Sequence, residues 1–206
     1  MSAPIFDGRF PHNWTAEILL TRPMIMPRRH YIYPGAVEEV ERGALEVLVH
    51  PATGESFLAT CALGFRDPAA PTGIWSCPNP DWICAVSGGY AYLVDVKNPE
   101  RFTMLRYRPV LEVLHYSCDL FDKSTDYSDK SQDQQSILFD RLLLLVGHHS
   151  ILAWGSDGEA WESDRLSWEG ITNLRIEGNV LRGDGWDLRT DKELPFALDV
   201  NTGKRI

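Results

Sequence analysis

The chain has 206 residues, of which 44% are hydrophobic and 24% charged, and its formal net charge is −9. This length suits a single domain with a sizeable buried core, and the composition is that of an ordinary globular protein. The negative charge is concentrated in residues 111–206, which carry eighteen acidic and ten basic side chains. An acidic surface repels phosphate backbones, so the composition argues against a nucleic-acid-binding protein.

The sequence also predicts the compartment. It contains no CxxC pair, so neither a zinc site nor a disulfide framework is indicated for its four cysteines, Cys61, Cys77, Cys84 and Cys118. The first residues lack the basic start and apolar core of a signal peptide. The longest aliphatic run, Leu142–Val146, is far shorter than the ~20 residues of a membrane helix. We therefore expect a cytoplasmic protein that does not enter a membrane.

Residues 1–43 are expected to be irregular, because prolines interrupt this segment repeatedly. One or two helical turns are predicted within "VEEVERGA", residues 37–44, ending at Gly43. The stretch "RRHYIY" places Arg28 and Arg29 beside aromatic residues, which makes it the best candidate for contact with an anion or a nucleic acid. The alternative is an edge strand whose arginine stems cover apolar surface.

Residues 44–116 alternate between short apolar runs and turns, which predicts a series of β-hairpins. The strand-like runs "LEVLVH" and "ESFLATCALGF" flank the turn "PATG", and "WICAV" and "YAYLVDV" flank a Gly-Gly pair. A proline-rich loop, "TGIWSCPNPDW", places Trp75 and Trp82 around a rigid Pro-Asn-Pro. We expect this loop to present an aromatic anchor to a partner protein. The alternative is that both tryptophans cover the edge of the core.

Residues 117–136 are polar and acidic. Their aspartates recur at spacings of three and four, which on a helix would form one acidic stripe. Like charges at these spacings repel, and Ser, Thr and Asp are poor helix formers, so we expect a mobile surface loop. A partner-binding segment and a calcium site are the alternatives. The stretch lacks the Gly and the terminal Glu of an EF-hand calcium loop.

Residues 137–206 are predicted to form further hairpins, and "GHHSILAWGSDGEAW", 147–161, is the most distinctive stretch. Asp-Gly favours a two-residue turn with Asp157-Gly158 at its tip, which places Trp154 opposite Trp161. His148 and His149 are adjacent, so on a strand they would point to opposite faces. We expect the two histidines to have a structural role, with metal binding and acid–base chemistry as alternatives.

A second hairpin is predicted in "NLRIEGNVLRG", with its turn at Gly178-Asn179. This turn places Ile176 opposite Leu181. It also places Arg175 opposite Arg182, which is unfavourable unless a carboxylate lies nearby.

The fold class follows from the number of short strands. Ten or eleven are expected between residues 44 and 200, without a long amphipathic helix, so residues 1–206 should form one all-β domain. The expected architecture is an antiparallel meander that is propeller-like or a sandwich. The phrases "FALDVNTGK" (196–204), "SILAWGSDGEAWES" (150–163) and "AYLVDVKNPERFTML" (91–105) resemble the strand-and-turn phrase of quinoprotein-type β-propellers. The resemblance implies a blade-like architecture but no activity, because the catalytic and cofactor residues of those dehydrogenases have no counterparts here.

No motif specifies a reaction, because a G-x-S-x-G elbow, an H-E-x-x-H pair and a P-loop are all missing from the sequence. The leading hypothesis is a non-enzymatic protein-binding module, of the immunity or inhibitor kind, that engages a basic partner protein. The alternatives are a hydrolase using His148, His149 and nearby carboxylates, and a structural subunit of a larger assembly. No cofactor and no metal are expected. The candidate binding residues are Trp75, Trp82, Asp119, Asp122, Asp126, Asp129, Arg28 and Arg29.

Overall fold

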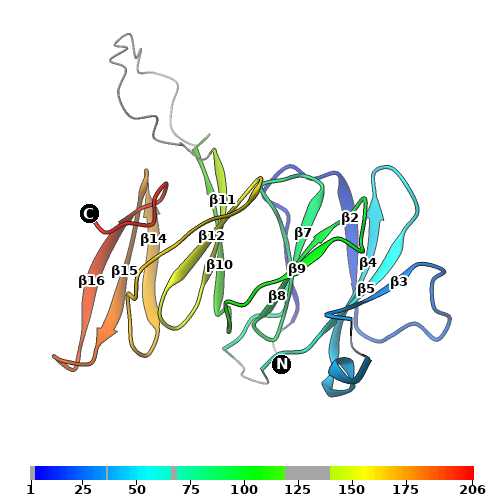
Figure 1. Ribbon diagram of the computed structural model, residues 1–206, viewed down its shortest axis with the longest axis horizontal. Helices are drawn as coiled ribbons and strands as arrows, with labels where there is room; N and C mark the ends of the chain where they lie inside the picture. The colour runs from blue at the N-terminus through cyan, green and yellow to red at the C-terminus, as the bar shows by residue number, and fades with distance from the viewer. Residues whose placement is uncertain (1–2, 36, 66–68, 119–139) are drawn as a thin grey trace, which may run out of the picture.

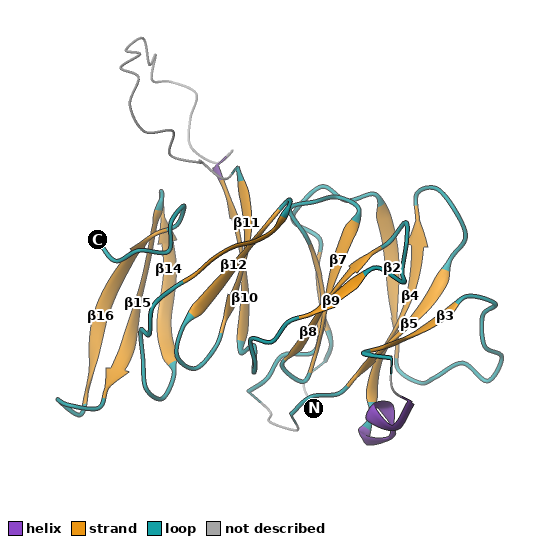
Figure 2. Ribbon diagram, in the orientation of Figure 1, coloured by secondary structure: helices purple, strands orange, loops and turns teal. Residues whose placement is uncertain are grey.

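The computed structural model describes residues 3–35, 37–65, 69–118 and 140–206. Over these ranges the fold is all-β, as predicted, and the strands form four sheets. The sheets lie face to face in one row (Figure 1), and we number them along that row from the right of the figure. The 3₁₀-helix η1 (Val37–Arg42) agrees with the helical turns predicted there (Figure 2).

Two sheets contain the strands of the first half of the chain. Sheet 1 has the order β2 (Trp14–Leu19), β4 (Ala44–Pro51), β5 (Phe57–Ala62), β3 (His30–Tyr33). Sheet 2 has the order β1 (Ile5–Asp7), β6 (Gly73–Ser76), β7 (Trp82–Ser87), β8 (Tyr90–Asp95), β9 (Phe102–Met104).

The second half of the chain forms two simple meanders. Sheet 3 has the order β10 (Glu112–Ser117), β11 (Arg141–Val146), β12 (Ile151–Gly155), β13 (Gly158–Glu162). Sheet 4 has the order β14 (Ile171–Glu177), β15 (Val180–Asp187), β16 (Lys192–Asp199).

The N-terminal segment differs from the expectation that residues 1–43 are irregular. It provides β1, β2 and β3, each at the edge of a sheet. β1 pairs with β6 and β3 pairs with β5 in parallel, whereas the other strand pairs are antiparallel. Its five prolines lie outside these strands, so each short strand fits between two chain breaks; the prolines are Pro4, Pro11, Pro23, Pro27 and Pro34.

Three hydrophobic cores fill the spaces between consecutive sheets. Sheets 2 and 3 are therefore buried on both faces. On β11, Leu143 and Leu145 pack toward sheet 2, while Leu142 and Leu144 pack toward sheet 4. This two-sided burial explains the continuous apolar run of β11, since alternation is needed only where one face meets water.

The predicted second hairpin is confirmed. Ile176 pairs with Leu181 and Arg175 pairs with Arg182 across the β14–β15 turn. The carboxylate that this arginine pair needs is Glu177, whose two oxygens accept hydrogen bonds of 2.9 Å from the two Nε atoms. The strand pairing therefore follows the apolar residues, and a local carboxylate offsets the repulsion.

The predicted register of the first hairpin is wrong. The turn consists of Ser156-Asp157, because Gly155 pairs with Gly158. The pairing then shifts between Ala153 and Trp154, so that Trp161 lies opposite Ala153 and Trp154 opposite Glu159. This irregularity sends the two tryptophans into different cores. Trp154 packs toward sheet 2, whereas Trp161 packs toward sheet 4.

The row of sheets is open and does not close into a propeller (Figure 1). The three phrases that resemble propeller blades fall in three different sheets, namely on β8–β9, on β12–β13 and at the end of β16. Each of these sheets is antiparallel in its meander, but the chain as described is a stack rather than a ring. Within the described ranges, no helix has the length and apolar character needed to span a membrane.

Candidate functional site

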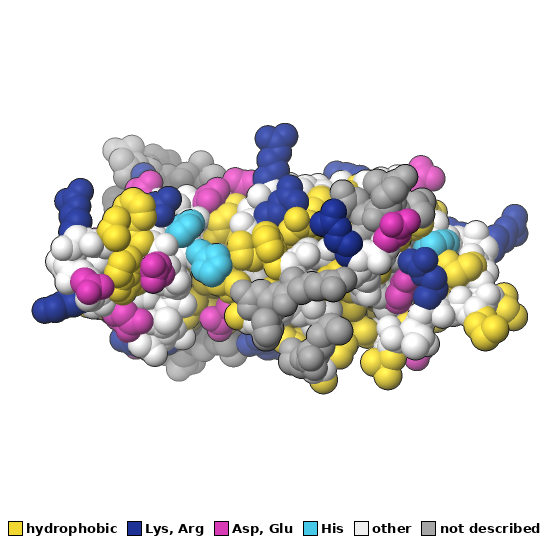
Figure 3. All heavy atoms as spheres, turned by 90° about the horizontal axis from the view of Figure 1, so that it is seen from below, with side chains coloured by type: hydrophobic (Ala, Val, Ile, Leu, Met, Phe, Trp, Pro, Cys, Tyr) yellow, Lys and Arg dark blue, Asp and Glu magenta, His cyan; other side chains and the backbone are white. Residues whose placement is uncertain are grey.

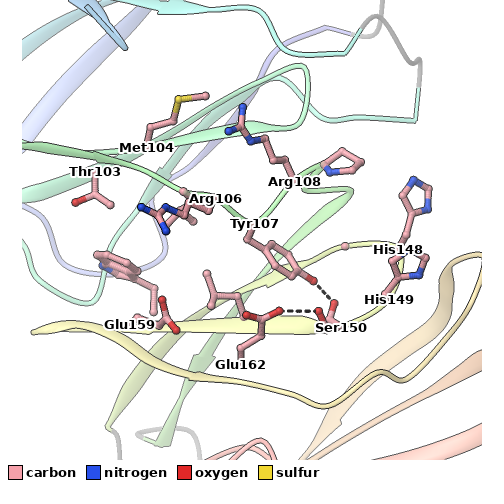
Figure 4. A pocket seen from close by; sticks show the side chains of 15 residues that line it. Thr103, Met104, Arg106, Tyr107, Arg108, His148, His149, Ser150, Glu159 and Glu162 are labelled. Atoms are coloured by element: carbon pink, nitrogen blue, oxygen red, sulfur yellow. Dashed lines mark hydrogen bonds between the residues drawn. The ribbon is translucent and has the colours of Figure 1, made fainter.

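A cleft of about 740 Å³ opens between sheets 2 and 3. One side consists of the end of β9 and the connection that follows it, residues 103–109, and the other is the β12–β13 hairpin with the turn that precedes it, residues 147–150. β9 is the edge strand of sheet 2 and has only three residues. The chain that follows it, residues 105–109, lines the cleft. Figure 4 shows the side chains that line this space.

The floor of the cleft is apolar. Leu105 and Leu152 are buried there, and Trp154 is half-buried because the irregularity in β12–β13 turns it toward sheet 2. Figure 3 shows histidine and hydrophobic side chains lying beside each other on the lower face of the molecule. A ligand that removed this apolar surface from water would gain about 25 cal/mol per Å² of area covered.

Tyr107 fixes the shape of the cleft. Its hydroxyl donates a hydrogen bond to the backbone carbonyl of Ser150, while the Ser150 hydroxyl donates to Glu162 Oε1 at 3.0 Å (Figure 4). Gly147 makes room for this ring, since a Cβ atom there would lie 2.7 Å from the Tyr107 hydroxyl oxygen. Burial raises the pKa of Tyr107 to about 12, so the phenol stays protonated and acts as a hydrogen-bond donor at neutral pH.

The charged groups of the cleft lie on opposite sides. Arg106 comes from the β9–β10 connection, and Glu159 and Glu162 come from β13 (Figure 4). The Arg108 guanidinium packs over the Tyr90 ring, with 4.8 Å between its Cζ atom and the ring centroid. The lining therefore carries two arginines and two carboxylates, and both carboxylates lie on the β13 side of the cleft.

His148 and His149 lie in the β11–β12 turn at one end of the cleft (Figure 4). His149 Nδ1 donates a hydrogen bond of 3.2 Å to the Ser167 carbonyl, and the His149 carbonyl accepts one of 2.6 Å from the Leu166 backbone N–H. His149 therefore joins this turn to the segment that leads into sheet 4. These bonds agree with a structural role for His149, and the structural role of His148 stays a prediction.

The described side chains do not form a recognisable catalytic centre in the cleft. No group of three or more His, Cys, Asp or Glu side chains in the described ranges is arranged to hold a metal ion. The Ser150 hydroxyl donates to the Glu162 carboxylate and not to a histidine. The geometry thus gives no support to hydrolysis at His148 and His149, which stays a prediction.

A serine–histidine–aspartate arrangement does occur elsewhere. Ser76 Oγ lies 3.4 Å from His115 Nε2, and His115 Nδ1 lies 3.5 Å from Asp7 Oδ2. Ser76 is fully buried, and the Phe10 ring packs on the His115 ring at 4.5 Å between centroids. The Ser76 hydroxyl oxygen also accepts the Phe10 N–H at 2.9 Å. A substrate cannot reach this hydroxyl, so the cluster is a structural link between β1, β6 and β10.

The two tryptophans predicted as aromatic anchors lie in or beside the core and are not in the cleft. Trp75 is only 3% exposed between sheets 2 and 3, which leaves it no surface to offer a partner. Trp82 is half-buried, and the Arg101 guanidinium lies 5.4 Å from its ring centroid. Their shared loop is tied down by Asn79, whose side-chain amide donates to the Ser156 carbonyl at 3.2 Å. Both tryptophans therefore fit the alternative prediction, that they cover the edge of the core, better than a role as aromatic anchors.

The two predicted arginines, Arg28 and Arg29, are also outside the cleft. Arg29 precedes the edge strand β3, donates to the Glu55 carbonyl at 3.0 Å and packs over Tyr31 and Phe57, as expected for an arginine covering an apolar surface. Arg28 is exposed beside it. The four aspartates, Asp119, Asp122, Asp126 and Asp129, lie outside the described residues.

Sequence reasoning missed Arg106, Tyr107 and Glu159 as a group. The available signal was the pair of arginines around Tyr107 after a short apolar run, but nothing local connects them to a hairpin some fifty residues later. Comparison with known proteins adds no assignment, because no family model, no curated protein and no solved structure matches this chain.

Proposed function

We propose that this protein is a non-enzymatic binding module that takes an extended segment of another protein into the cleft, as an added strand beside β9. The observation that carries the proposal is the open edge of β9 at the margin of an apolar cleft. An exposed strand edge with a hydrophobic pocket beside it is the usual setting for recognition by strand addition.

The backbone of β9 has the alternation that strand addition needs. The Leu105 N–H donates to the Ala91 carbonyl, and the Asp95 N–H donates to the Arg101 carbonyl, so the odd-numbered residues face β8. In an antiparallel pair, the residues between them point their N–H and C=O groups the other way. Met104 is the last such residue of β9 and lines the cleft.

The side chains of the cleft define the kind of segment that would fit. An added strand would place apolar side chains on Leu152 and Trp154, and basic side chains beside Glu159 and Glu162. This chemistry agrees with the partner that the net charge of −9 suggests, since an acidic protein attracts basic partners before contact. We therefore propose a partner segment that combines basic and apolar residues.

Two broader features belong to the same proposal. A cytoplasmic setting is supported by the free thiols of Cys61, Cys77 and Cys84, which are buried in the cores. A blade-like architecture of the individual sheets is supported by the meander order of sheets 3 and 4.

Selection of short random peptides displayed on phage tests the proposal even while the partner protein is unidentified. We expect the selected peptides to alternate apolar with Lys or Arg residues and to avoid proline. They should lose affinity by about tenfold or more for the double variant Glu159→Lys, Glu162→Lys, since like charges then face each other. In NMR titrations, the backbone amide of Met104 and the Trp154 indole should shift.

A matched control is the double variant Asp187→Lys, Glu193→Lys, which changes as many charges on sheet 4. It should bind the selected peptides as the wild type does. Peptides without a shared pattern, or peptides that bind the cleft variant equally well, would contradict the proposal. Turnover of ester, amide or glycoside substrates that is lost in His148→Ala would instead support the hydrolase alternative.

A further inference from the structure

The loop between β2 and β3, residues 20–29, exposes an unusual number of large apolar side chains. Leu20 and Ile25 are each 89% exposed, Met24 is fully exposed and Met26 is 39% exposed. Soluble proteins usually scatter such residues singly, whereas several together mark an interaction surface. The loop lies beyond the strands of sheet 1, at the right-hand end of the row in Figure 1, and Figure 3 shows hydrophobic side chains at this end.

A polar network holds the loop at both ends. Arg22 Nε donates to Glu46 Oε1 at 2.7 Å, and the other oxygen of Glu46 accepts a hydrogen bond from the Thr60 hydroxyl. His30, at the far end of the loop, lies 2.8 Å from the same hydroxyl through Nε2. Glu46 is only 6% exposed and Thr60 is fully buried. A buried carboxylate is costly unless it is paired and hydrogen-bonded, so Glu46 favours the conformation in which the loop supplies these partners.

Two prolines shape the part of the loop that carries the apolar side chains. Pro23 and Pro27 bracket Met24–Met26, and each fixes its own φ angle and restricts the residue before it. The prolines therefore restrict the backbone on both sides of the apolar tip, which lowers the entropy lost when a partner binds. Methionine side chains adapt their shape to such a partner.

The charge around the loop differs from that of the whole molecule. Residues 20–30 contain three arginines and no acidic residue, in a chain of net charge −9. Glu46 pairs with Arg22, but Arg29 donates to an uncharged carbonyl, and Arg28 is exposed. Within the described ranges, two arginine charges beside the apolar tip thus remain without a carboxylate partner.

We propose that the β2–β3 loop is a second docking surface, which binds an acidic polypeptide segment bearing apolar side chains. Attachment to an anionic bilayer generally needs a cluster of about 4–8 basic residues, and this loop offers two. An acidic segment needs only to match two arginines and a few apolar contacts. The loop is on sheet 1 and the cleft lies between sheets 2 and 3, so the protein would bind two partners at once.

Parallel peptide selections on the wild type and on the double variant Met24→Ser, Ile25→Ser test this inference. We expect the wild type alone to enrich peptides that combine Asp or Glu with Leu, Ile or Phe. These peptides should lose affinity by about tenfold for Arg28→Glu and keep it for Glu159→Lys, Glu162→Lys. That last comparison separates the two sites, so either proposal can fail without the other.

The matched control is Leu188→Ser, Leu194→Ser, which removes two exposed apolar side chains from the opposite end of the stack. It should bind the acidic peptides normally, and all variants should melt like the wild type because these side chains are solvated. If the selection yields no peptide whose binding depends on the loop, the inference is overturned. Loop-dependent sedimentation with phosphatidylserine vesicles, or loop-dependent dimerisation in the ultracentrifuge, would also overturn it, since each would identify a different occupant.

Discussion

His115 Nδ1 lies 3.5 Å from the Asp7 carboxylate and has no hydrogen-bond partner among the described residues. On the other side of the ring, Nε2 lies 3.2 Å from the Ser76 carbonyl, which assigns the proton of the neutral ring to Nε2. The imidazole therefore holds β10 against β6 while its unprotonated nitrogen faces a carboxylate. Burial lowers the pKa of His115, although the charge of Asp7 opposes this effect.

The lowered pKa predicts a loss of stability in mild acid. Above the ordinary histidine pKa of 6.5, the ring is neutral in both the folded and the unfolded chain. Below it, the unfolded chain binds the proton first, so the free energy of unfolding falls as the pH drops toward the folded pKa. Urea titrations of the wild type between pH 7 and pH 5.5 should show this decline. His115→Gln should be less stable at pH 7 but should decline less.

His30 contributes in the same direction, because burial also lowers its pKa, despite the charge of Glu46. His30→Gln is therefore measured beside His115→Gln. If both variants lost stability with pH as steeply as the wild type, neither histidine would be responsible. Asp7 does not affect stability between pH 7 and pH 5.5. Burial raises the pKa of Asp7, but Arg9 and His115 more than offset this, so the net shift is downward. Its contribution to stability is therefore lost only below its ordinary pKa of 3.8.

Gly203 is predicted to be irreplaceable because of Trp161. Its φ of +68° disfavours other residues, and a Cβ atom there would lie 2.4 Å from the Trp161 ring. Gly178 has a similar φ of +61° but nothing within 4 Å of the corresponding position. Gly203→Ala should therefore cost about 1–3 kcal/mol more than Gly178→Ala, the difference being overpacking. Chemical denaturation of the two variants would measure it, and equal costs would show that the tryptophan gives way.

The arginine pair of the β14–β15 hairpin should depend on Glu177. Hydrogen bonds from Arg175 and Arg182 lower the pKa of Glu177, so it stays ionised well into the acid range. Glu177→Gln should lower the denaturation midpoint slightly at low salt, and the loss should shrink at high salt, because the exposed arginines are then screened from each other. Glu169→Gln, another exposed change of the same kind, should show neither effect. A salt-independent loss in Glu177→Gln would point to packing instead.

The parts of the fold that the sequence predicted are those with local signals. The all-β class, the helical turn before Gly43 and the Gly178-Asn179 hairpin each depend on neighbouring residues. The parallel strand β1 was missed, and β3 was predicted only as the alternative for "RRHYIY", since each pairs with a strand many residues away and its own sequence has no hairpin partner. The cleft was missed for the same reason, because Tyr107 follows sheet 2 and its partner Ser150 precedes a strand of sheet 3.

The register of the β12–β13 hairpin could not be predicted from its own sequence either. Nothing in "ILAWGSDGEAW" reveals the irregularity at Ala153 and Trp154, because a register shift depends on which face of the hairpin each neighbouring sheet covers. Sheet 3 is covered by a hydrophobic core on both faces, so a tryptophan can be buried among apolar side chains whichever face it points to. The simpler pairing was favoured by turn chemistry alone and was overridden by packing.

The separation of Trp154 and Trp161 gives a sharp final prediction. Trp161 is 8% exposed, and its Nε1 donates to the Val200 carbonyl at 2.9 Å, so Trp161→Ala should destabilise the protein by about 3–5 kcal/mol. Trp154 is half-buried at the cleft, so Trp154→Ala should cost less and should mainly weaken peptide binding. A facing pair would show a coupling energy of about 0.5–1 kcal/mol in a double-mutant cycle. We expect a smaller value, because the two rings belong to different cores. A coupling within or above that range would contradict this expectation and favour the cross-strand pair that the Asp-Gly turn predicts.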